Sequence, residues 1–182
     1  MDHSPELDAW INAGRRESLC GYDIFCRVQA TPGKEPLLLI HGFPTASYDW
    51  HPLWDALAAR YSLYAFDLLG FGLSAKPRGH DYPITIQADL CEALLARCGV
   101  QRPHVLAHDY GVTVAQELLA RELDGRLQLG SLCFLNGGLF QETHRARPIQ
   151  KLLANAWLGP ILARAITYGT FSRTMRRIGG TH

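Results

Sequence analysis

The sequence predicts an α/β fold in which a mainly parallel β-sheet is flanked by helices. Short, unbroken apolar runs such as residues 36–40 (PLLLI) suit strands buried on both faces of a sheet. Between these runs lie longer segments in which apolar residues, such as Leu90 and Leu94, recur at helical spacing. Because the links between the two kinds of segment are short, we expect parallel strands with helices on both faces.

The strands are expected where apolar or aromatic runs end at turn residues. Six such runs span residues 17–20, 22–28, 36–40, 62–67, 104–109 and 131–135. Helices are expected between them. One begins near Trp50, with Pro52 in its first turn and Leu53, Trp54 and Leu57 on one face. A second follows Thr85 as N-cap and ends before Gly99, and a third spans residues 112–123.

The chain of 182 residues suits one domain, divided here into a sheet core (1–138) and the beginning of a helical cap (139–182). After residue 138 only helical patterns follow, so the C-terminal core strands of such a sheet are expected to be absent from this chain.

Composition excludes several classes of partner and site. A net charge of +1 gives no reason to expect nucleic acid or an anionic membrane as partner. The five cysteines are odd in number and lack C-x-x-C spacing, which favours reduced thiols in a cytoplasmic protein over disulfides or a metal site. The N-terminus has no signal-peptide pattern, and no apolar run reaches the roughly 20 residues that span a bilayer.

The segment Ala107-His-Asp-Tyr-Gly111 joins an expected strand directly to an expected helix. It has the small-x-nucleophile-x-Gly form of a nucleophile elbow, with Asp109 where many hydrolases have serine. His108 and Gly111 complete the motif, and the helix dipole favours an ionised carboxylate. On this segment alone, an ordinary N-cap aspartate explains the pattern equally well.

A second segment, His41-Gly42-Phe43-Pro44, ends the strand at residues 36–40. In hydrolases with a nucleophile elbow, the loop at this place supplies one backbone N–H of an oxyanion hole. Phe43 would then donate one N–H, and Tyr110, directly after Asp109, the other. Alone, the segment also suits an ordinary turn.

A third segment, residues 67–77, contains Gly70-Phe-Gly72-Leu-Ser-Ala75, which formally satisfies a dinucleotide-binding fingerprint. That fingerprint needs a helix to begin at its glycines. Here Pro77 and Pro83 interrupt the chain before helical spacing begins. We therefore expect no nicotinamide or flavin cofactor.

Taken together, H-G-F-P, D-x-x-G-F-G-x-S-x-K-P and H-D-Y-G resemble the epoxide hydrolase and haloalkane dehalogenase branch of the α/β-hydrolase fold. The stretches HGFPTASYDW, AHDYGVTVAQELLAR and LNGGLFQETHRARPIQKLL look most similar to mesoderm-specific transcript-like members. The likeness runs from about residue 15 to about residue 175. It implies an α/β-hydrolase sheet, no cofactor, no metal and a small apolar organic substrate.

The resemblance also implies a mechanism. Asp109 would attack a substrate carbon and form an alkyl-enzyme ester, which a histidine-activated water would then hydrolyse. The resulting oxyanion on the Asp109 side chain would face the Phe43 and Tyr110 amides.

Departures from the family pattern bear on substrate and completeness. Phe43 and Tyr110 stand where dehalogenases have Asn and Trp donors, which argues against halide release. Tyr168, the single tyrosine of the cap segment, does not match a cap acid. The base histidine and its orienting acid are expected to be absent from this chain, because Glu142, His144 and His182 are misplaced for those roles.

Three hypotheses stay open at this point. The chain belongs to a hydrolase of epoxide-hydrolase type, to a dehalogenase or an ester or lactone hydrolase on the same fold, or to a non-catalytic pseudoenzyme or fragment. On its own, the chain is expected to turn over negligibly and to associate through an open sheet edge. The sequence does not determine the substrate or the oligomeric state.

Overall fold

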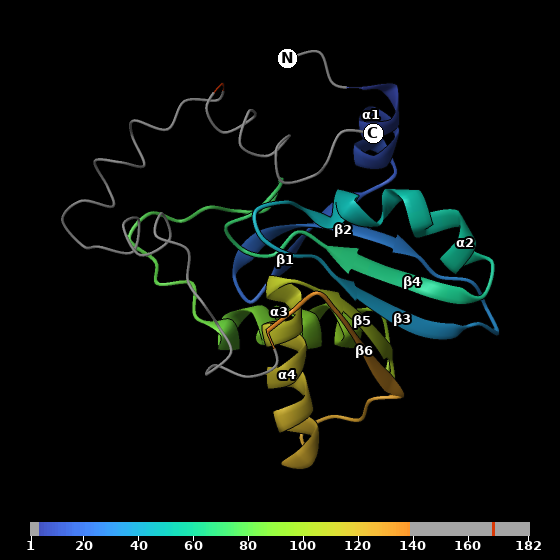
Figure 1. The fold of residues 1–182 in the computed structure, drawn as a ribbon, viewed down its shortest axis with the longest axis vertical. Coiled ribbons are helices and arrows are strands. Elements are labelled where there is room, and N and C mark those ends of the chain that lie inside the picture. Colours follow the sequence, from blue (N-terminus) through green and yellow to red (C-terminus); the bar gives the residue numbers. More distant parts are fainter. Residues whose placement is uncertain (1–3, 139–168, 170–182) are drawn as a thin grey trace. The chain divides into compact units, whose positions relative to one another are not determined.

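The computed structural model describes residues 4–138 and residue 169 (Figure 1). The chain divides into two units, Met1–Leu139 and Phe140–His182, and the sheet with its flanking helices belongs to the first of them. The expectations for Glu142, His144, Tyr168 and His182 lie outside the described residues.

Six strands form one sheet within the described part of the chain. They are β1 (Arg15–Leu19), β2 (Tyr22–Gln29), β3 (Glu35–Ile40), β4 (Tyr61–Phe66), β5 (His104–His108) and β6 (Ser131–Leu135), in the spatial order β1-β2-β4-β3-β5-β6. The pairs that β3 makes with β4 and β5, and that β5 makes with β6, are parallel. Only the two pairs that β2 makes, with β1 and with β4, are antiparallel. The expected mainly parallel sheet is therefore confirmed.

The helices flank this sheet, as Figure 1 shows. They are α1 (Pro5–Asn12), the 3-10 helix η1 (Ser47–Leu53), α2 (Trp54–Ala58), α3 (Ile84–Arg97) and α4 (Tyr110–Leu123). The helix α1 was not expected from the sequence, although Ser4 accepts a hydrogen bond from Leu7 N–H as its N-cap (3.3 Å) and Pro5 follows at the first helical position.

Two sequence-based details of the helices are wrong. The N-cap of α3 is Pro83, not Thr85, because Pro83 has φ −64° and ψ 151° and the helix begins directly after it. The segment from Trp50 is a 3-10 helix followed by a short α-helix, and Leu53 is 48% exposed while Trp54 is buried. Consecutive residues of either helix type point in directions about 100–120° apart, so Leu53 faces solvent where Trp54 enters the core.

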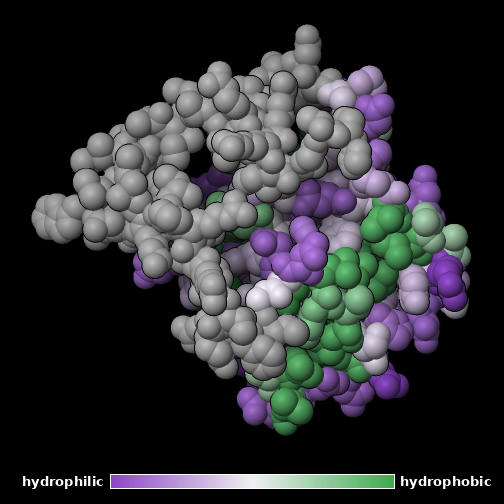
Figure 2. All heavy atoms as spheres, viewed as in Figure 1, coloured by the Kyte–Doolittle hydropathy of each residue, from purple (hydrophilic) through white to green (hydrophobic). Residues whose placement is uncertain are grey.

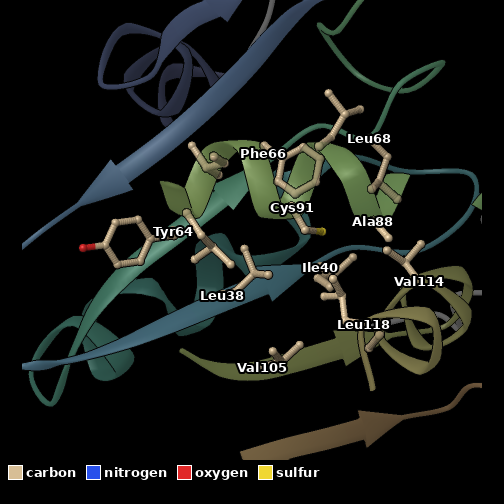
Figure 3. Packing of buried hydrophobic residues seen from close by; sticks show 14 of the residues in the cluster. Leu38, Ile40, Tyr64, Phe66, Leu68, Ala88, Cys91, Val105, Val114 and Leu118 are labelled. Atoms are coloured by element: carbon tan, nitrogen blue, oxygen red, sulfur yellow. The ribbon is translucent and has the colours of Figure 1, made fainter. Parts of the chain in front are cut away.

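Each face of the sheet carries its own hydrophobic core, because alternate residues of a strand point to opposite faces. On the α3 and α4 side, Leu38 and Ile40 of β3 pack with Phe66 of β4 and Leu118 of α4 (Figure 3). On the other side, Leu37 and Leu39 belong to the cluster that the helices α1, η1 and α2 cover, which also contains Trp10, Trp50 and Trp54. The strand β3 is therefore buried on both faces from Leu37 to its last residue, Ile40.

The edge strand β6 is less covered than the central strands. Its residues alternate between exposed and half-buried, and Cys133 and Leu135 are exposed. In the space-filling view, apolar side chains gather beside α4, over β5 and β6 (Figure 2). Among the described residues, none of the helices is both long enough and apolar enough to span a membrane.

Candidate active site

Asp109 lies where β5 ends and α4 begins, at the carboxyl edge of the parallel strands. Its backbone has φ 52° and ψ −117°, a conformation that costs a non-glycine residue about 1–3 kcal/mol. The Asp109 N–H donates a hydrogen bond to the Leu135 carbonyl oxygen at 2.9 Å. The end of β6 therefore holds this strained turn in place.

The Asp109 side chain does not cap the helix that it precedes. It makes no side-chain hydrogen bond to α4. Instead its Oδ1 accepts a hydrogen bond from the Phe43 backbone N–H at 2.9 Å, across 66 residues of sequence. The ordinary N-cap explanation of Asp109 therefore does not describe this geometry, and the HGFP and HDYG segments come together at one place.

Two glycines allow the two loops to approach this closely. A Cβ atom on Gly42 would lie 2.5 Å from Asp109 Cβ and 3.1 Å from the His108 carbonyl oxygen. A Cβ atom on Gly111 would lie 2.6 Å from the carbonyl oxygens of both Ile40 and His41. Any larger residue at either position would push the loop after β3 away from Asp109.

Tyr110, the other expected donor, is the first residue of α4. Its backbone N–H makes no hydrogen bond to the Asp109 carboxylate in the described part of the chain, where Phe43 N–H is the donor to Oδ1. Pro44, also part of the predicted motif, follows Phe43 through a cis peptide bond.

Aromatic side chains surround this place. The Phe71 ring lies 6.2 Å from the Phe43 ring and 5.8 Å from the Tyr110 ring, measured between centroids. Phe43 is 65% exposed, whereas Phe71 and Tyr110 are half-buried, and burial raises the pKa of the Tyr110 phenol. The surface near Asp109 is therefore largely aromatic, which suits contact with an apolar group. Phe71 was not expected to contribute to the site, although it lies inside the segment 67–77.

Asp67 ties the loop after β3 to the loop after β4. Its side chain is buried, and Oδ1 accepts hydrogen bonds from Ser47 N–H (2.8 Å) and Ser47 Oγ–H (2.6 Å). Oδ2 accepts a third from Leu73 N–H at 2.7 Å. From the sequence, Asp67 was recognised only as the first residue of the motif D-x-x-G-F-G. The signal that could have found it is an acidic residue at the end of an apolar strand, since buried carboxylates need several donors.

His41 occupies the centre of the same region and is fully buried. Its Nε2 accepts a hydrogen bond from Leu68 N–H at 2.9 Å, and its Nδ1 lies 2.8 Å from the Gly42 carbonyl oxygen. Burial lowers the pKa of the imidazole, so His41 is held neutral. The Phe71 ring packs edge-on against it at 5.4 Å.

No group of three or more potential metal ligands occurs among the described residues. His104, four residues before His108, contacts Ser131 Oγ (2.8 Å) and Glu35 (3.2 Å) at the opposite end of β5 from Asp109. The donors near Asp109 are backbone N–H groups, which bind anions rather than cations.

The sheet and its flanking helices agree with comparisons to known proteins. A family model described as "alpha/beta hydrolase fold" matches residues 35–152. The mesoderm-specific transcript homolog protein of Bos taurus is 45% identical over 188 residues, covering 98% of this chain and 56% of that protein. The chain therefore spans about half the length of this curated relative.

Solved structures show the same architecture. The epoxide hydrolase CorEH is 26% identical with a TM-score of 0.63, over 78% of this chain and 49% of that one. The haloalkane dehalogenase DatA from Agrobacterium tumefaciens C58 has a TM-score of 0.69 over 84% of this chain and 52% of that one, and at 20% identity it shows the fold alone. From its sheet, its family match and its relatives, this chain belongs to the α/β-hydrolase fold family and resembles the mesoderm-specific transcript proteins within it.

Proposed function

We propose that Asp109 is the nucleophile of a hydrolase of epoxide-hydrolase type that works through an alkyl-enzyme ester. The single observation that supports this most directly is the hydrogen bond from Phe43 N–H to Asp109 Oδ1 (2.9 Å), combined with the absence of any capping bond from Asp109 to α4. A carboxylate that does not cap its helix, and that binds a backbone N–H through one oxygen, has its other oxygen available for nucleophilic attack.

The two carboxylate oxygens of Asp109 take different roles in this proposal. Oδ1 is engaged by Phe43 N–H, so Oδ2 is the atom that attacks an epoxide carbon. The carbon–oxygen bond of the epoxide breaks, the new alkoxide takes a proton, and Oδ2 becomes the ester oxygen. Oδ1 is then the ester carbonyl oxygen.

The second step hydrolyses this ester. Water attacks the Asp109 carboxyl carbon, and the negative charge develops on Oδ1, next to Phe43 N–H, with Tyr110 N–H as the proposed second donor. Collapse of the intermediate breaks the Cγ–Oδ2 bond, so Oδ2 leaves in the diol and the oxygen of the attacking water takes its place in the restored carboxylate. The base and its orienting acid are not assigned to any described residue.

We propose a small apolar organic substrate, because Phe43, Phe71 and Tyr110 present aromatic surface beside Asp109. Neither Phe43 nor Tyr110 carries a side-chain N–H that could bind a halide, which favours an epoxide over a haloalkane. A cytoplasmic location is also part of the proposal. It is supported by the five cysteines, all of which are free thiols, because reduced thiols are typical of the cytoplasm. One of them, Cys26, is buried in the core, and burial raises the pKa of its thiol to about 12.

Mass spectrometry of quenched single turnovers with styrene oxide tests the nucleophile. We expect an adduct on the Asp109 peptide of the unsubstituted chain and none in Asp109→Asn, because an amide is a far poorer nucleophile than a carboxylate. The exposed carboxylate Asp124, at the other end of α4, provides the matched control Asp124→Asn, which should retain the adduct.

An adduct that persists in Asp109→Asn, after deamidation to aspartate is excluded by peptide mass, would overturn the assignment. Parallel reactions with 1-bromobutane and with a p-nitrophenyl ester distinguish the substrate classes. Faster adduct formation with either compound than with the epoxide would replace the epoxide proposal by a dehalogenase or an esterase.

A further inference from the structure

The peptide group between Gly42 and Phe43 connects the buried interior behind this loop to the reacting atoms. Its N–H is the donor to Asp109 Oδ1. Its carbonyl oxygen is 2.8 Å from His41 Nδ1. In a trans peptide the N–H and C=O point in opposite directions, so His41 and Asp109 lie at the two ends of one dipole.

The partners of His41 determine which of its nitrogens carries the proton. A carbonyl oxygen only accepts, so Nδ1 must donate to Gly42. The Leu68 backbone N–H only donates, so Nε2 at 2.9 Å must be unprotonated. Because both partners are backbone groups, neither can reverse its role, and His41 is fixed as the neutral Nδ1–H tautomer.

We propose that His41 is a positioning residue for the oxyanion hole, acting through a hydrogen-bonded relay from Leu68 N–H through its imidazole and the Gly42–Phe43 peptide to Asp109 Oδ1. This inference rests on the proposed role of Asp109. Hydrogen bonds in a chain polarise one another, by roughly 10–30% per bond. The imidazole therefore both orients the peptide and strengthens Phe43 N–H as a donor.

The surroundings hold the relay rigidly. His41 is fully buried, and the Phe71 ring packs edge-on against the imidazole. Thr45 Oγ1 lies 3.4 Å from the Gly42 carbonyl oxygen, but its single hydroxyl hydrogen is donated to the nearer Asp49 Oδ2, which leaves His41 Nδ1 as the donor to Gly42. Asp67 anchors the far end of the same loop through Ser47. The peptide is thus held by His41 at its carbonyl oxygen and by Asp109 at its N–H before substrate arrives.

Nuclear magnetic resonance of the full chain, labelled with nitrogen-15, tests the relay without requiring activity. We expect the His41 imidazole nitrogen shifts to report the neutral Nδ1–H tautomer between about pH 6.5 and 8. An Nε2–H tautomer or a charged ring in this range would overturn the proposal.

Three variants separate the two ends of the imidazole. His41→Asn keeps a donor near the position of Nδ1, His41→Gln keeps an acceptor near the position of Nε2, and His41→Leu keeps neither. In His41→Leu and His41→Gln, we expect the resonance of the Phe43 amide proton to shift upfield and the proton to exchange faster with solvent. In His41→Asn, we expect its chemical shift and exchange rate to stay nearest those of the unsubstituted chain. The control His104→Gln, at the opposite end of β5, should leave the Phe43 amide unchanged.

The kinetic readout is the decay of the Asp109 ester after styrene oxide treatment, followed with imidazole added as an external base because the base histidine is expected to be absent from this chain. His41→Leu should slow this decay about ten-fold, less than the roughly 10²–10³ expected for loss of a whole oxyanion donor. Equal decay in a folded His41→Leu chain, or a Phe43 amide insensitive to all three variants, would overturn the relay and leave the nucleophile proposal intact. If the His41 tautomer and the Phe43 amide behave as expected but no adduct forms on Asp109, the nucleophile proposal is overturned instead.

Discussion

Phe43 and Asp109 are 66 residues apart in sequence, yet the Phe43 N–H lies 2.9 Å from Asp109 Oδ1. This hydrogen bond joins the loop after β3 to the turn between β5 and α4. Because β3 and β5 are parallel neighbours, with Ile40 paired to Ala107, their carboxyl ends lie side by side. The bond is therefore a direct consequence of sheet order, and it can be broken by small changes in either loop.

Gly42→Ala tests the close approach of the two loops. The added Cβ would lie 2.5 Å from Asp109 Cβ, so the loop must move, and we expect a loss of about 1–3 kcal/mol in unfolding free energy. Adduct formation on Asp109 should fall with it. Gly138→Ala is the matched control, because a Cβ there meets no atom of the described residues within 4 Å. Urea unfolding measures the loss of stability, and mass spectrometry measures the loss of adduct. Equal stability and equal adduct formation in Gly42→Ala and Gly138→Ala would show that the loop tolerates a Cβ at residue 42.

Asp67→Asn tests the clamp between the loops after β3 and β4. An amide nitrogen cannot accept a hydrogen bond, so a buried N–H of Ser47 or Leu73 would lose its partner. We expect destabilisation of about 1–3 kcal/mol, measured by urea unfolding. The exposed Asp81→Asn provides the control and should unfold like the unsubstituted chain. If Asp67→Asn is as stable as Asp81→Asn, the Asp67 carboxylate is not needed to hold the two loops together.

Arg121→Met tests the contact between α3 and α4. The Arg121 side chain is 4% exposed and lies within 2.6–2.8 Å of Asp89, Glu92 and Glu117. Burial disfavours the guanidinium charge, but hydrogen bonds to these three carboxylates outweigh it and raise the pKa of Arg121.

Removal of this cation leaves three partly exposed carboxylates facing one another. We expect a loss of about 2–3 kcal/mol, below the range for fully buried pairs because water reaches the carboxylates. Arg126→Met is the control, since Arg126 is 54% exposed and 3.9 Å from Glu92, and it should cost less than about 1 kcal/mol. Similar thermal melting midpoints for the two variants would argue against a structural role for Arg121.

The pH dependence of stability should carry a contribution from His41. Burial lowers its pKa below the ordinary value of 6.5, outweighing Asp67 and Asp49, which favour the charged ring, while His108 disfavours it. As pH falls through 6.5, the unfolded chain binds a proton at this histidine and the folded chain does not. This contribution to stability is therefore fully present above that pH and declines below it.

The measurement compares the urea unfolding free energy of the unsubstituted chain and His41→Leu from about pH 7.5 to about pH 5, a range that brackets the ordinary histidine pKa. The difference between them should shrink towards acid, because only the former contains this titrating group. A constant difference across the range would mean that His41 has an ordinary pKa in the folded state.

The order of strands and helices was predictable from the sequence because it depends on local patterns. Apolar runs such as residues 36–40 and the helical spacing of Leu90 and Leu94 are recorded directly in the chain. The motifs around Phe43 and Asp109 were also visible, since each occupies a few consecutive residues. Thr85 was misassigned because Pro83 starts α3 two residues earlier by its own backbone restriction.

Tertiary structure alone decided which groups meet. The Asp109 side chain could have capped α4, and only the arrival of the loop after β3 gives its carboxylate the Phe43 N–H as a partner. The tautomer of His41 likewise depends on Leu68, 27 residues away, and the donors of Asp67 come from two different loops. The pairing of β3 with β4 and β5 brings these partners together. No local pattern in the sequence encodes such contacts, because the residues that meet are far apart along the chain.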